Sequence, residues 1–379
     1  MLGKSENILR EGHQIKLLQS GYEYFTALYD GIASAKQSIH LQFYIYDDDE
    51  TGYCVTDLLC KAAERGVAVE VAVDAFGSED LSAESIIKLR QAGIQFKKFS
   101  PLFTTKGFHI GLRLHHKIAL FDGQTALIGG INIANKYRGD AANIPWLDFA
   151  VEIKGPCVQD IEAVCKGIWQ KNNVRKPKQI KFANGGMQAR ILQNDWLRRK
   201  IEISTAYRQA IRKADKEIVL VASYFLPGIR IRRLLKNARK RGVGITVLLG
   251  GVSDVQSVKR ASNYLYGWLI RNGIKIYEWK PSVLHGKIAM VDGKWVTIGS
   301  YNINFLSDYG SIELNAEIAD KEFATAVHRK IENIIAEGCE EITVEKYKQT
   351  SFLGLVLDWL SYQLIRTSFK IMFLLMKRE

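Results

Sequence analysis

Residues 114–135 read LHHKIALFDGQTALIGGINIAN, and residues 284–304 read LHGKIAMVDGKWVTIGSYNIN. Both stretches carry a histidine, a lysine at +2, an aspartate at +7, a glycine at +14 and an asparagine at +17. The shared positions are His115, Lys117, Asp122, Gly129 and Asn132 in the first copy and His285, Lys287, Asp292, Gly299 and Asn302 in the second. Duplication of a structural hairpin would explain the match but not the polar residues inside apolar strands, so we interpret the pattern as a functional site.

The sequence around these two stretches is also repeated. Residues 32–67 match residues 211–243 with one three-residue gap, and each copy has the pattern helix, strand, loop, helix. The runs VAVEVAVDAFG and GITVLLGG that follow are β-branched, bounded by glycine and too short for helices, which predicts buried strands. Strands that alternate with helices are typical of an α/β sheet covered on both faces. The sequence therefore predicts two similar α/β/α halves with mixed sheets, residues 1–175 and 188–345, related by a pseudo-twofold axis, and an apolar tail at residues 351–379.

Two segments break the symmetry of the halves. The basic stretch KNNVRKPKQIKFANGGM, residues 171–187, lacks a hydrophobic period, which predicts a surface linker. The first half has ten more residues between Pro101 and His115 than the matching part of the second half. We interpret the extra segment TTKGFHIGLR, residues 104–113, as an inserted loop that forms a rim or lid beside the histidines.

Composition and charge limit the possible classes of protein. The chain has 379 residues, of which 47% are hydrophobic and 25% charged, so a largely disordered or collagen-like protein is excluded. A net charge of +13 favours a polyanionic partner, which is nucleic acid, an anionic membrane or a phosphorylated substrate. Five cysteines without a CxxC spacing argue against a disulfide framework or a thiolate zinc site. Neither a signal peptide nor a charge-free apolar run long enough to span a membrane is present, so we expect a protein that stays inside the cell.

The Asp-Gly pairs of both motifs predict hairpin turns. Centring the turns on these pairs places Gly130 opposite His115 and Ser300 opposite His285, which leaves room for a bulky group above each imidazole. The motif asparagines then follow at the same strand end. If the two halves face one another, two imidazoles, two ammonium groups and two amides surround one tetrahedral oxyanion, which predicts a phosphate site.

The period of a β-strand places the basic residues of each motif on one face. Side chains two residues apart point the same way, so His115 lies beside Lys117, and His285 beside Lys287. Imidazole is a nucleophile and proton carrier near neutral pH, and lysine supplies positive charge to the oxygens of a phosphodiester. The lysines would repel a cation, and the HExxH, Cys-His and GxxxxGK[ST] patterns are absent, so we expect neither a metal nor another cofactor.

The double signature, HxKxxxxD followed by G[GS]xN, resembles that of the phospholipase D superfamily. Over residues 14–345 the layout is similar to the shorter bacterial cardiolipin synthases, which lack N-terminal membrane helices. The resemblance implies a two-step exchange without a metal. One histidine attacks phosphorus, the other protonates the leaving alcohol, and a second alcohol then resolves a phosphohistidine. By this resemblance we expect His115 to be the nucleophile and His285 the general acid and then base.

The resemblance also implies roles for other residues. The remaining catalytic residues of the signature are Lys117, Lys287, Asp122 and Asp292. The two aspartates are expected in turns, where they position the hairpins. The implied phosphate-binding and orienting residues are Asn132, Asn302, Ser300, Asp148 and Glu313. Family members orient each histidine with a carboxylate downstream of the other motif, which implies the cross-pairs His115 with Glu313 and His285 with Asp148.

The reaction implied by the resemblance joins two phosphatidylglycerol molecules into cardiolipin and releases glycerol. Phosphatidylethanolamine is the phosphatidyl donor in some relatives. A hydrolytic phospholipase would differ only in its product, phosphatidic acid. A nuclease of the same superfamily would suit the charge of +13, but the apolar tail argues against it, so we expect no nucleic-acid partner. A catalytically inactive membrane scaffold is disfavoured because both motifs are complete.

The tail SFLGLVLDWLSYQLIRTSFKIMFLLMKRE, residues 351–379, is the most apolar part of the chain. It is either a C-terminal core helix or a segment that inserts into the membrane interface. Trp359, Tyr362 and the basic end residues are typical of that interface, so we expect a peripheral or tail-anchored protein on the cytoplasmic face of the membrane. The basic stretch IRIRRLLKNARKRG, residues 229–242, is either a solvated helix face or a site for anionic lipid headgroups.

Overall fold

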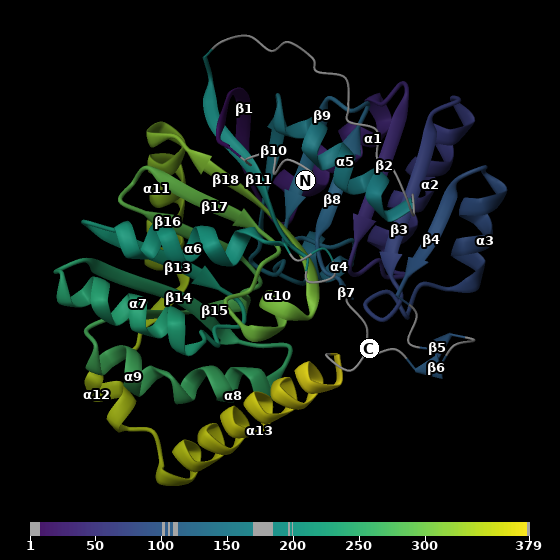
Figure 1. Cartoon of the computed structure of the whole chain (residues 1–379). Helices are drawn as coiled ribbons and strands as arrows, with labels where there is room; N and C mark the ends of the chain where they lie inside the picture. Colours follow the sequence, from purple (N-terminus) through teal and green to yellow (C-terminus); the bar gives the residue numbers. More distant parts are fainter. Residues whose placement is uncertain are drawn as a thin grey trace.

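The structure is a computed structural model that describes residues 8–100, 103–104, 107–108, 113–169, 185–195, 198 and 200–376. The predicted linker and the inserted loop lie largely outside these residues. Two large sheets with helices on their faces make up the described part of the chain (Figure 1).

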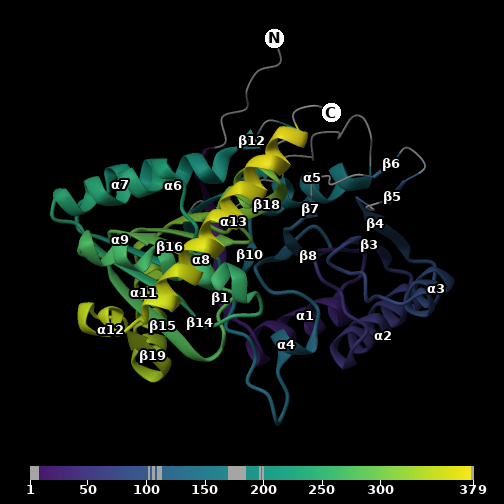
Figure 2. The ribbon, with the colours of Figure 1, turned by 90° about the horizontal axis from the view of Figure 1, so that it is seen from below.

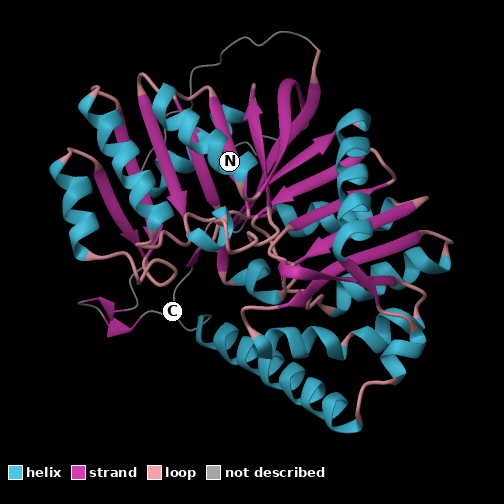
Figure 3. Ribbon diagram, turned by 180° about the vertical axis from the view of Figure 1, so that it is seen from behind, coloured by secondary structure: helices cyan, strands magenta, loops and turns pink. Residues whose placement is uncertain are grey.

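The first half is a mixed sheet with helices packed on it (Figure 3). Its strands lie in the spatial order β1-β10-β9-β8-β2-β3-β4, in which β2, β3 and β4 are parallel and the other neighbours antiparallel. The strands are β1 (Arg10–Gln19), β2 (Ser38–Phe43), β3 (Ala68–Asp74), β4 (Gln95–Phe99), β8 (Lys117–Phe121), β9 (Thr125–Gly129) and β10 (Phe149–Lys154), with the short β5 (Phe103–Thr104), β6 (Gly107–Phe108) and β7 (Arg113–Leu114). The helices are α1 (Tyr22–Ser34), α2 (Glu50–Glu64), α3 (Ala83–Gln91), α4 (Asn135–Arg138) and α5 (Cys157–Trp169). Helices α1 to α3 bury Leu28, Leu59 and Leu89 in one cluster with the apolar side chains of β2 and β3.

The second half repeats this arrangement in the order β11-β18-β17-β16-β13-β14-β15, with β19 paired beyond β15. Its strands are β11 (Met187–Asp195), β12 (Lys200–Ile201), β13 (Glu217–Ala222), β14 (Gly244–Val252), β15 (Lys275–Val283), β16 (Lys287–Val291), β17 (Trp295–Gly299), β18 (Ser311–Ala319) and β19 (Cys339–Glu341). Its helices are α6 (Glu202–Lys213), α7 (Ile229–Lys240), α8 (Gln256–Tyr264), α9 (Tyr266–Arg271), α10 (Phe305–Tyr309), α11 (Lys321–Gly338), α12 (Val344–Lys348) and α13 (Phe352–Met376). Because each of the seven strands of the first sheet has a counterpart at the same place in the second, the prediction of two similar α/β halves is confirmed.

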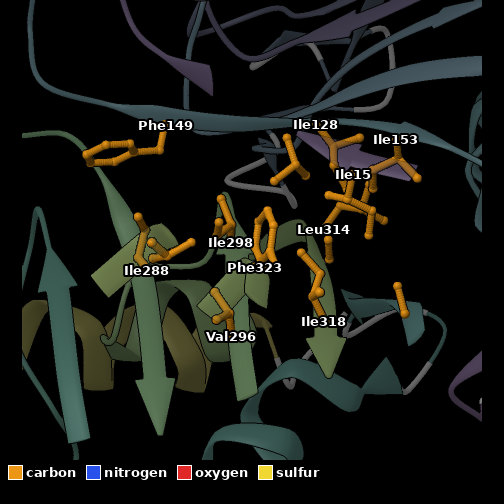
Figure 4. Packing of buried hydrophobic residues seen from close by; sticks show 14 of the residues in the cluster. Ile15, Ile128, Phe149, Ile153, Ile288, Val296, Ile298, Leu314, Ile318 and Phe323 are labelled. Atoms are coloured by element: carbon orange, nitrogen blue, oxygen red, sulfur yellow. The ribbon is translucent and has the colours of Figure 1, made fainter. Parts of the chain in front are cut away.

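One hydrophobic cluster of the core spans the two halves. Strand β1 pairs with β11, and apolar side chains of β8–β10 and α5 meet those of β16–β18 and α11 (Figure 4). Its buried members include Ile128, Phe149, Ile153, Ile288, Ile298, Leu314 and Phe323. Two parallel bridges, Leu114–Ile312 and Leu147–Leu284, cross between the halves directly before the motif histidines. The starts of β8 and β16 are thereby brought together.

Both motifs form the predicted hairpins, but with a longer turn than expected. Strands β8 and β9 pair Phe121 with Thr125, so the turn holds three residues, and its Asp-Gly pair has φ values of 54° and 63°. The additional residue shifts the register by one, so Gly130 is not opposite His115. Strands β16 and β17 repeat this register, and Ser300 is not opposite its histidine either. The predicted pairing of Gly130 and Ser300 with the motif histidines, on which the expected space above each imidazole depended, is therefore wrong.

Asp122 and Asp292 fasten these hairpins to the rest of their halves. The Asp122 carboxylate accepts hydrogen bonds from three successive N–H groups, those of residues 36–38, at 2.7–3.2 Å. The Asp292 carboxylate accepts them from residues 215–217 over the same range. Each carboxylate therefore ties its turn to the start of β2 or β13.

Helix α13 crosses the outside of α8 (Figure 2). The two helices are in contact through Tyr362 and Tyr264, whose ring centres are 4.7 Å apart. Among the described residues, no helix combines the length and the apolar character that crossing a membrane requires.

Candidate active site

Each motif histidine is fixed by the backbone of the opposite half. The N–H of His115 donates to the carbonyl of Ile312 at 3.1 Å, and the N–H of His285 donates to the carbonyl of Leu147 at 2.8 Å. These bonds hold one histidine at the start of β8 and the other at the start of β16, on the two sides of the junction. The structure therefore brings the two motifs to one place.

A buried carboxylate from the opposite half contacts each imidazole. His115 Nδ1 lies 2.9 Å from Glu313 Oε2 on β18, and His285 Nδ1 lies 2.6 Å from Asp148 Oδ2, directly before β10. Neither carboxylate residue has exposed surface. A carboxylate on Nδ1 orients the ring so that Nε2 is the atom that acts on a substrate. Both implied cross-pairs are present.

Gly130 and Ser300 support these two carboxylates. A Cβ atom at Gly130 would lie 2.4 Å from Asp148 Oδ1, so only glycine leaves enough room for this carboxylate. In the second half, Ser300 Oγ donates a hydrogen bond to Glu313 and accepts one from the N–H of Leu314 at 3.1 Å. The two motifs therefore hold their acids by different means.

Two buried lysines lie close enough to influence each other. Lys117 and Lys287 are each 2% exposed and donate from Nζ to the backbone carbonyl of their own motif histidine. Burial lowers the pKa of Lys117 to about 7 and also lowers the pKa of Lys287. A bound anion would favour the charged form of both lysines, so the arrangement suits a phosphodiester. Among the described residues, no group of three His, Cys, Asp or Glu side chains is placed to hold a metal ion.

Burial also changes the protonation of the acid-base groups. Burial lowers the pKa of His115, although the carboxylate of Glu313 partly offsets this. Burial lowers the pKa of His285 well below its usual 6.5, and the two lysines add to the effect. Burial raises the pKa of Asp148 to about 7. A neutral imidazole is the form that attacks phosphorus, and a bound anionic substrate would favour protonation of the other imidazole.

The two motif asparagines are not equivalent. Asn132 is fully buried, its Oδ1 accepts the N–H of Ile45 at 3.0 Å, and its Nδ2 donates to the Tyr137 hydroxyl at 2.8 Å. Asn302 is also buried, but its Oδ1 has no hydrogen-bond partner among the described residues. The contacts of Asn132 argue against the predicted role of its amide as a phosphate ligand, whereas Asn302 keeps unused bonding capacity.

Asp122 and Asp292 are separated from the reacting groups. Each follows the far end of its strand, five residues beyond the motif lysine, which corresponds to roughly 17 Å along an extended strand. Their carboxylates are occupied by backbone N–H groups. These contacts agree with the hairpin-positioning role expected for the two aspartates.

Two of the aromatic residues around His285, Tyr137 and Trp146, were missed by the sequence analysis. The ring centres of Tyr137 and Trp146 lie 5.5 and 5.9 Å from that of His285, and Tyr224 follows at 6.2 Å. Tyr137 and Trp146 belong to the first half, in the segment between its motif and Asp148. The position of this segment between two site residues is the signal that could have identified them.

Asp74 is a further buried acid that the sequence analysis did not single out. Its Oδ2 accepts the N–H of Leu114 at 2.8 Å, and its Oδ1 lies 3.4 Å from Arg113 Nη1. Asp74 therefore fixes β7, the two residues that precede His115. It stands at the carboxyl end of the parallel strand β3, where site residues of open α/β sheets gather, and this position could have revealed it.

Comparison with known proteins finds one family model that matches both halves, and relatives that align over most of the chain. A family model described as "Cardiolipin synthase, PLD-like domain" matches residues 28–151 and 207–335. Cardiolipin synthase B of Salmonella typhimurium is 30% identical over 369 residues, which cover 94% of this chain and 89% of the relative. The probable cardiolipin synthase YwiE of Bacillus subtilis is 28% identical over 347 residues, or 88% of this chain and 68% of the relative.

Solved structures share the fold. Phosphatidylserine synthase of Haemophilus influenzae superposes with a TM-score of 0.76 at 16% identity and covers 97% of both chains. Polyphosphate kinase of Porphyromonas gingivalis superposes with a TM-score of 0.59 at 18% identity, over 94% of this chain and 53% of that one. Because the family model matches both halves and the Salmonella relative aligns over nearly the whole chain, this chain belongs to the cardiolipin synthase family of the phospholipase D superfamily.

Proposed function

We propose that the chain is a phosphatidyltransferase that joins two phosphatidylglycerol molecules into cardiolipin and releases glycerol. The observation that carries the proposal is the site at the junction of the halves, where each imidazole contacts a carboxylate of the opposite half. Two buried lysines, whose charged form a bound anion would favour, add the positive charge that a phosphodiester needs. Relatives that align over most of the chain are named cardiolipin synthases.

In the first step, Nε2 of His115 attacks the phosphorus of one phosphatidylglycerol. The bond from phosphorus to the glycerol oxygen breaks, and protonated His285 gives its proton to that oxygen, so glycerol leaves and a phosphohistidine forms. The Glu313 carboxylate contacts Nδ1 of His115 and stabilises the positive charge that develops on this ring.

In the second step, neutral His285 accepts the proton of a hydroxyl on the second phosphatidylglycerol. The resulting oxygen nucleophile attacks phosphorus and releases His115, which forms cardiolipin and restores the enzyme. His285 is 6% exposed and surrounded by Tyr137, Trp146 and Tyr224, which limits the access of bulk water to it. Because its substrates are bilayer lipids, we place the enzyme at the membrane surface, on the cytoplasmic face.

The test is to incubate the purified chain with phosphatidylglycerol, with and without phosphatidylethanolamine and a chelator, and to identify the products by mass spectrometry. We expect cardiolipin and equimolar glycerol, no effect of the chelator, and no product from His115→Ala or His285→Ala. Phosphatidic acid as the main product would show a hydrolase instead. Degradation of oligonucleotides without lipid turnover would show a nuclease.

The order of the two histidines needs a separate test. A phosphatidyl ester of p-nitrophenol has a leaving group that needs no acid, so His285→Asn should still form the intermediate and then accumulate it. Peptide mass spectrometry after rapid quenching should find the added phosphatidyl group on His115. In the reverse variant, His115→Asn, an adduct on His285 would overturn the assignment.

A further inference from the structure

Helix α13 exposes the side chains that a surface helix normally buries. Phe352, Leu353 and Leu364 are 82%, 66% and 65% exposed, and Leu360 is 49% exposed. Asp358, the one acidic residue in the sequence of this helix, is only 6% exposed. A helix on the surface of a soluble protein turns its apolar side to the core and its charges to water. Helix α13 has the opposite orientation on the protein that it contacts.

The contacts of α13 with α8 explain this orientation. Asp358 Oδ1 lies 3.5 Å from Arg260 Nη1, and the ring of Tyr362 packs on that of Tyr264. Asp358 and Tyr362 are four residues apart in α13, and their partners Arg260 and Tyr264 are four residues apart in α8. One turn of α13 therefore packs on one turn of α8. Asp358 and Tyr362 are therefore turned toward α8, whereas Leu353, Leu360 and Leu364 face outward.

This apolar surface leads toward the active site. Helix α13 contacts α10, which lies in the chain between Asn302 and Glu313. Figures 1 and 2 both place the C-terminal end of α13 near β7, the strand that precedes His115. A surface on which α13 lies flat would therefore be next to the junction of the two halves.

The charges of the segment indicate what covers the apolar face. Residues 351–379 carry four basic residues, Arg366, Lys370, Lys377 and Arg378, against two acidic ones, Asp358 and Glu379. Two copies of the helix would gather like charges, whereas an anionic bilayer would attract them. Trp359, which is 45% exposed, suits the headgroup layer. An anionic bilayer is therefore a better occupant than a second copy of the chain.

We propose that α13 lies flat in the interface of an anionic bilayer, held to the catalytic domain by the Asp358–Arg260 contact, and keeps the active site beside the lipid headgroups. This inference rests on the proposed function, because the lipids that α13 would meet are the proposed substrates. It describes a helix that binds the interface without crossing the membrane.

The test is flotation of the full chain with vesicles of phosphatidylglycerol and phosphatidylcholine. We expect Leu360→Glu/Leu364→Glu to weaken vesicle binding by about 10- to 100-fold, because it removes apolar contact and adds negative charge. The matched control is Ile8→Glu/Ile87→Glu, at two isoleucines of the first half that are 59% and 53% exposed, and it should bind as the wild type does. Turnover of dihexanoyl phosphatidylglycerol, kept below its micelle concentration, should be unchanged in both variants.

Other results would overturn the inference. Wild-type binding by Leu360→Glu/Leu364→Glu, or equal losses in the control, would show that α13 does not dock on lipid. If the wild type is a dimer and Leu360→Glu/Leu364→Glu is a monomer that still binds vesicles, the apolar face of α13 binds a second copy of the chain instead. If the double variant fails to fold, quenching of tryptophan emission by brominated lipid decides the question: Trp359→Phe should reduce it, and equal quenching would end the proposal. Absence of cardiolipin from the wild-type protein would instead refute the proposed function and leave vesicle binding as a separate result.

Discussion

Glu313 acts on the proposed reaction through His115, which gives it a specific pH signature. Burial lowers the pKa of His115, and the Glu313 carboxylate partly offsets this. Glu313→Gln removes the charge at constant size, so kcat should fall by about 10²- to 10⁴-fold. Because the pKa of His115 then falls further, its neutral form persists to lower pH, and the acidic limb of the pH–rate profile should move to lower pH.

The control for this variant is Glu317→Gln on the same strand. The Glu317 side chain contacts Arg190 and Trp295, so its substitution should leave kcat and the pH profile of the folded enzyme unchanged. An unshifted acidic limb in Glu313→Gln, whatever the rate, would mean that the acid does not control His115.

Gly130 tests whether the place of the Asp148 carboxylate matters for the rate. A Cβ atom at this position would lie 2.4 Å from Oδ1 and 2.6 Å from Oδ2 of Asp148, so Gly130→Ala must displace the carboxylate from His285. Misplacement of a catalytic group by about 1 Å costs about 10²-fold in rate, and we expect a fall in kcat of that size with little change in KM. Gly244→Ala, where the nearest atom would be 3.6 Å away, should have the wild-type kcat. Equal rates in the two variants would refute the supporting role of Gly130.

His116, next to the nucleophile in sequence, makes stability depend on pH. Burial lowers the pKa of His116 from its usual 6.5 to about 3, and its Nε2 lies 2.8 Å from Gln42 Oε1. Between these two pH values the unfolded chain binds a proton that the folded chain does not. The stability present above pH 6.5 is therefore lost as the pH falls, by up to about 1.4 kcal/mol per pH unit.

His116→Gln removes this titration. The slope of unfolding free energy against pH between pH 4 and 6.5 should therefore decrease by the amount that corresponds to about one bound proton. Denaturant titrations at several pH values measure the slope. Ile87→Gln, at an exposed position that carries no titratable group, serves as the control and should keep the wild-type slope. A wild-type slope in His116→Gln would contradict the pKa assigned to His116.

The two motif hairpins depend on their aspartates for stability and not for chemistry. Burial raises the pKa of Asp122, but the N–H groups of residues 36–38 lower it by more, so the pKa lies below its usual value. Asp122→Asn weakens these charge-assisted bonds and should reduce the unfolding free energy by about 1–3 kcal/mol at pH 7. The loss should shrink as the pH falls below 3.8, where the carboxylate is protonated in the unfolded chain. A fall in kcat of the folded enzyme comparable to that of His115→Ala would return Asp122 to the catalytic set.

Sequence patterns predicted the strands and the hairpins, since a period of two and an Asp-Gly turn are local signals. The histidine-carboxylate pairs were implied by the resemblance to the family. The error at Gly130 came from a single additional turn residue, which changes the register without changing the strand pattern. The hydrogen bonds of the Asn132 amide could not be predicted in the same way. Its partner Ile45 is 87 residues away, and the contact depends on how β2 packs beside β8.

The two halves depend on each other for the site and for the core. Each half contributes one motif histidine and the carboxylate that orients the other histidine. The core between the sheets also draws on both halves, and Phe149 of the first half lies against Gly286 of the second, where a Cβ atom would come within 2.7 Å of its ring. Stability and catalysis are therefore both properties of the assembled pair of halves.

This shared core predicts that the halves unfold together. Phe149 is 1% exposed, and Phe149→Ala leaves a cavity between the sheets that should reduce the unfolding free energy by about 3–5 kcal/mol. Because the cluster around Phe149 belongs to both halves, we expect them to unfold together. Hydrogen exchange should then show the same loss of protection free energy for the amides of β3 in the first half and of β14 in the second. Ile87→Ala, at an exposed position, should change neither by more than about 0.5 kcal/mol. A loss of protection confined to β3 would show that the cluster within each half unfolds independently of the other. The catalytic junction would then be a contact between two separately stable domains.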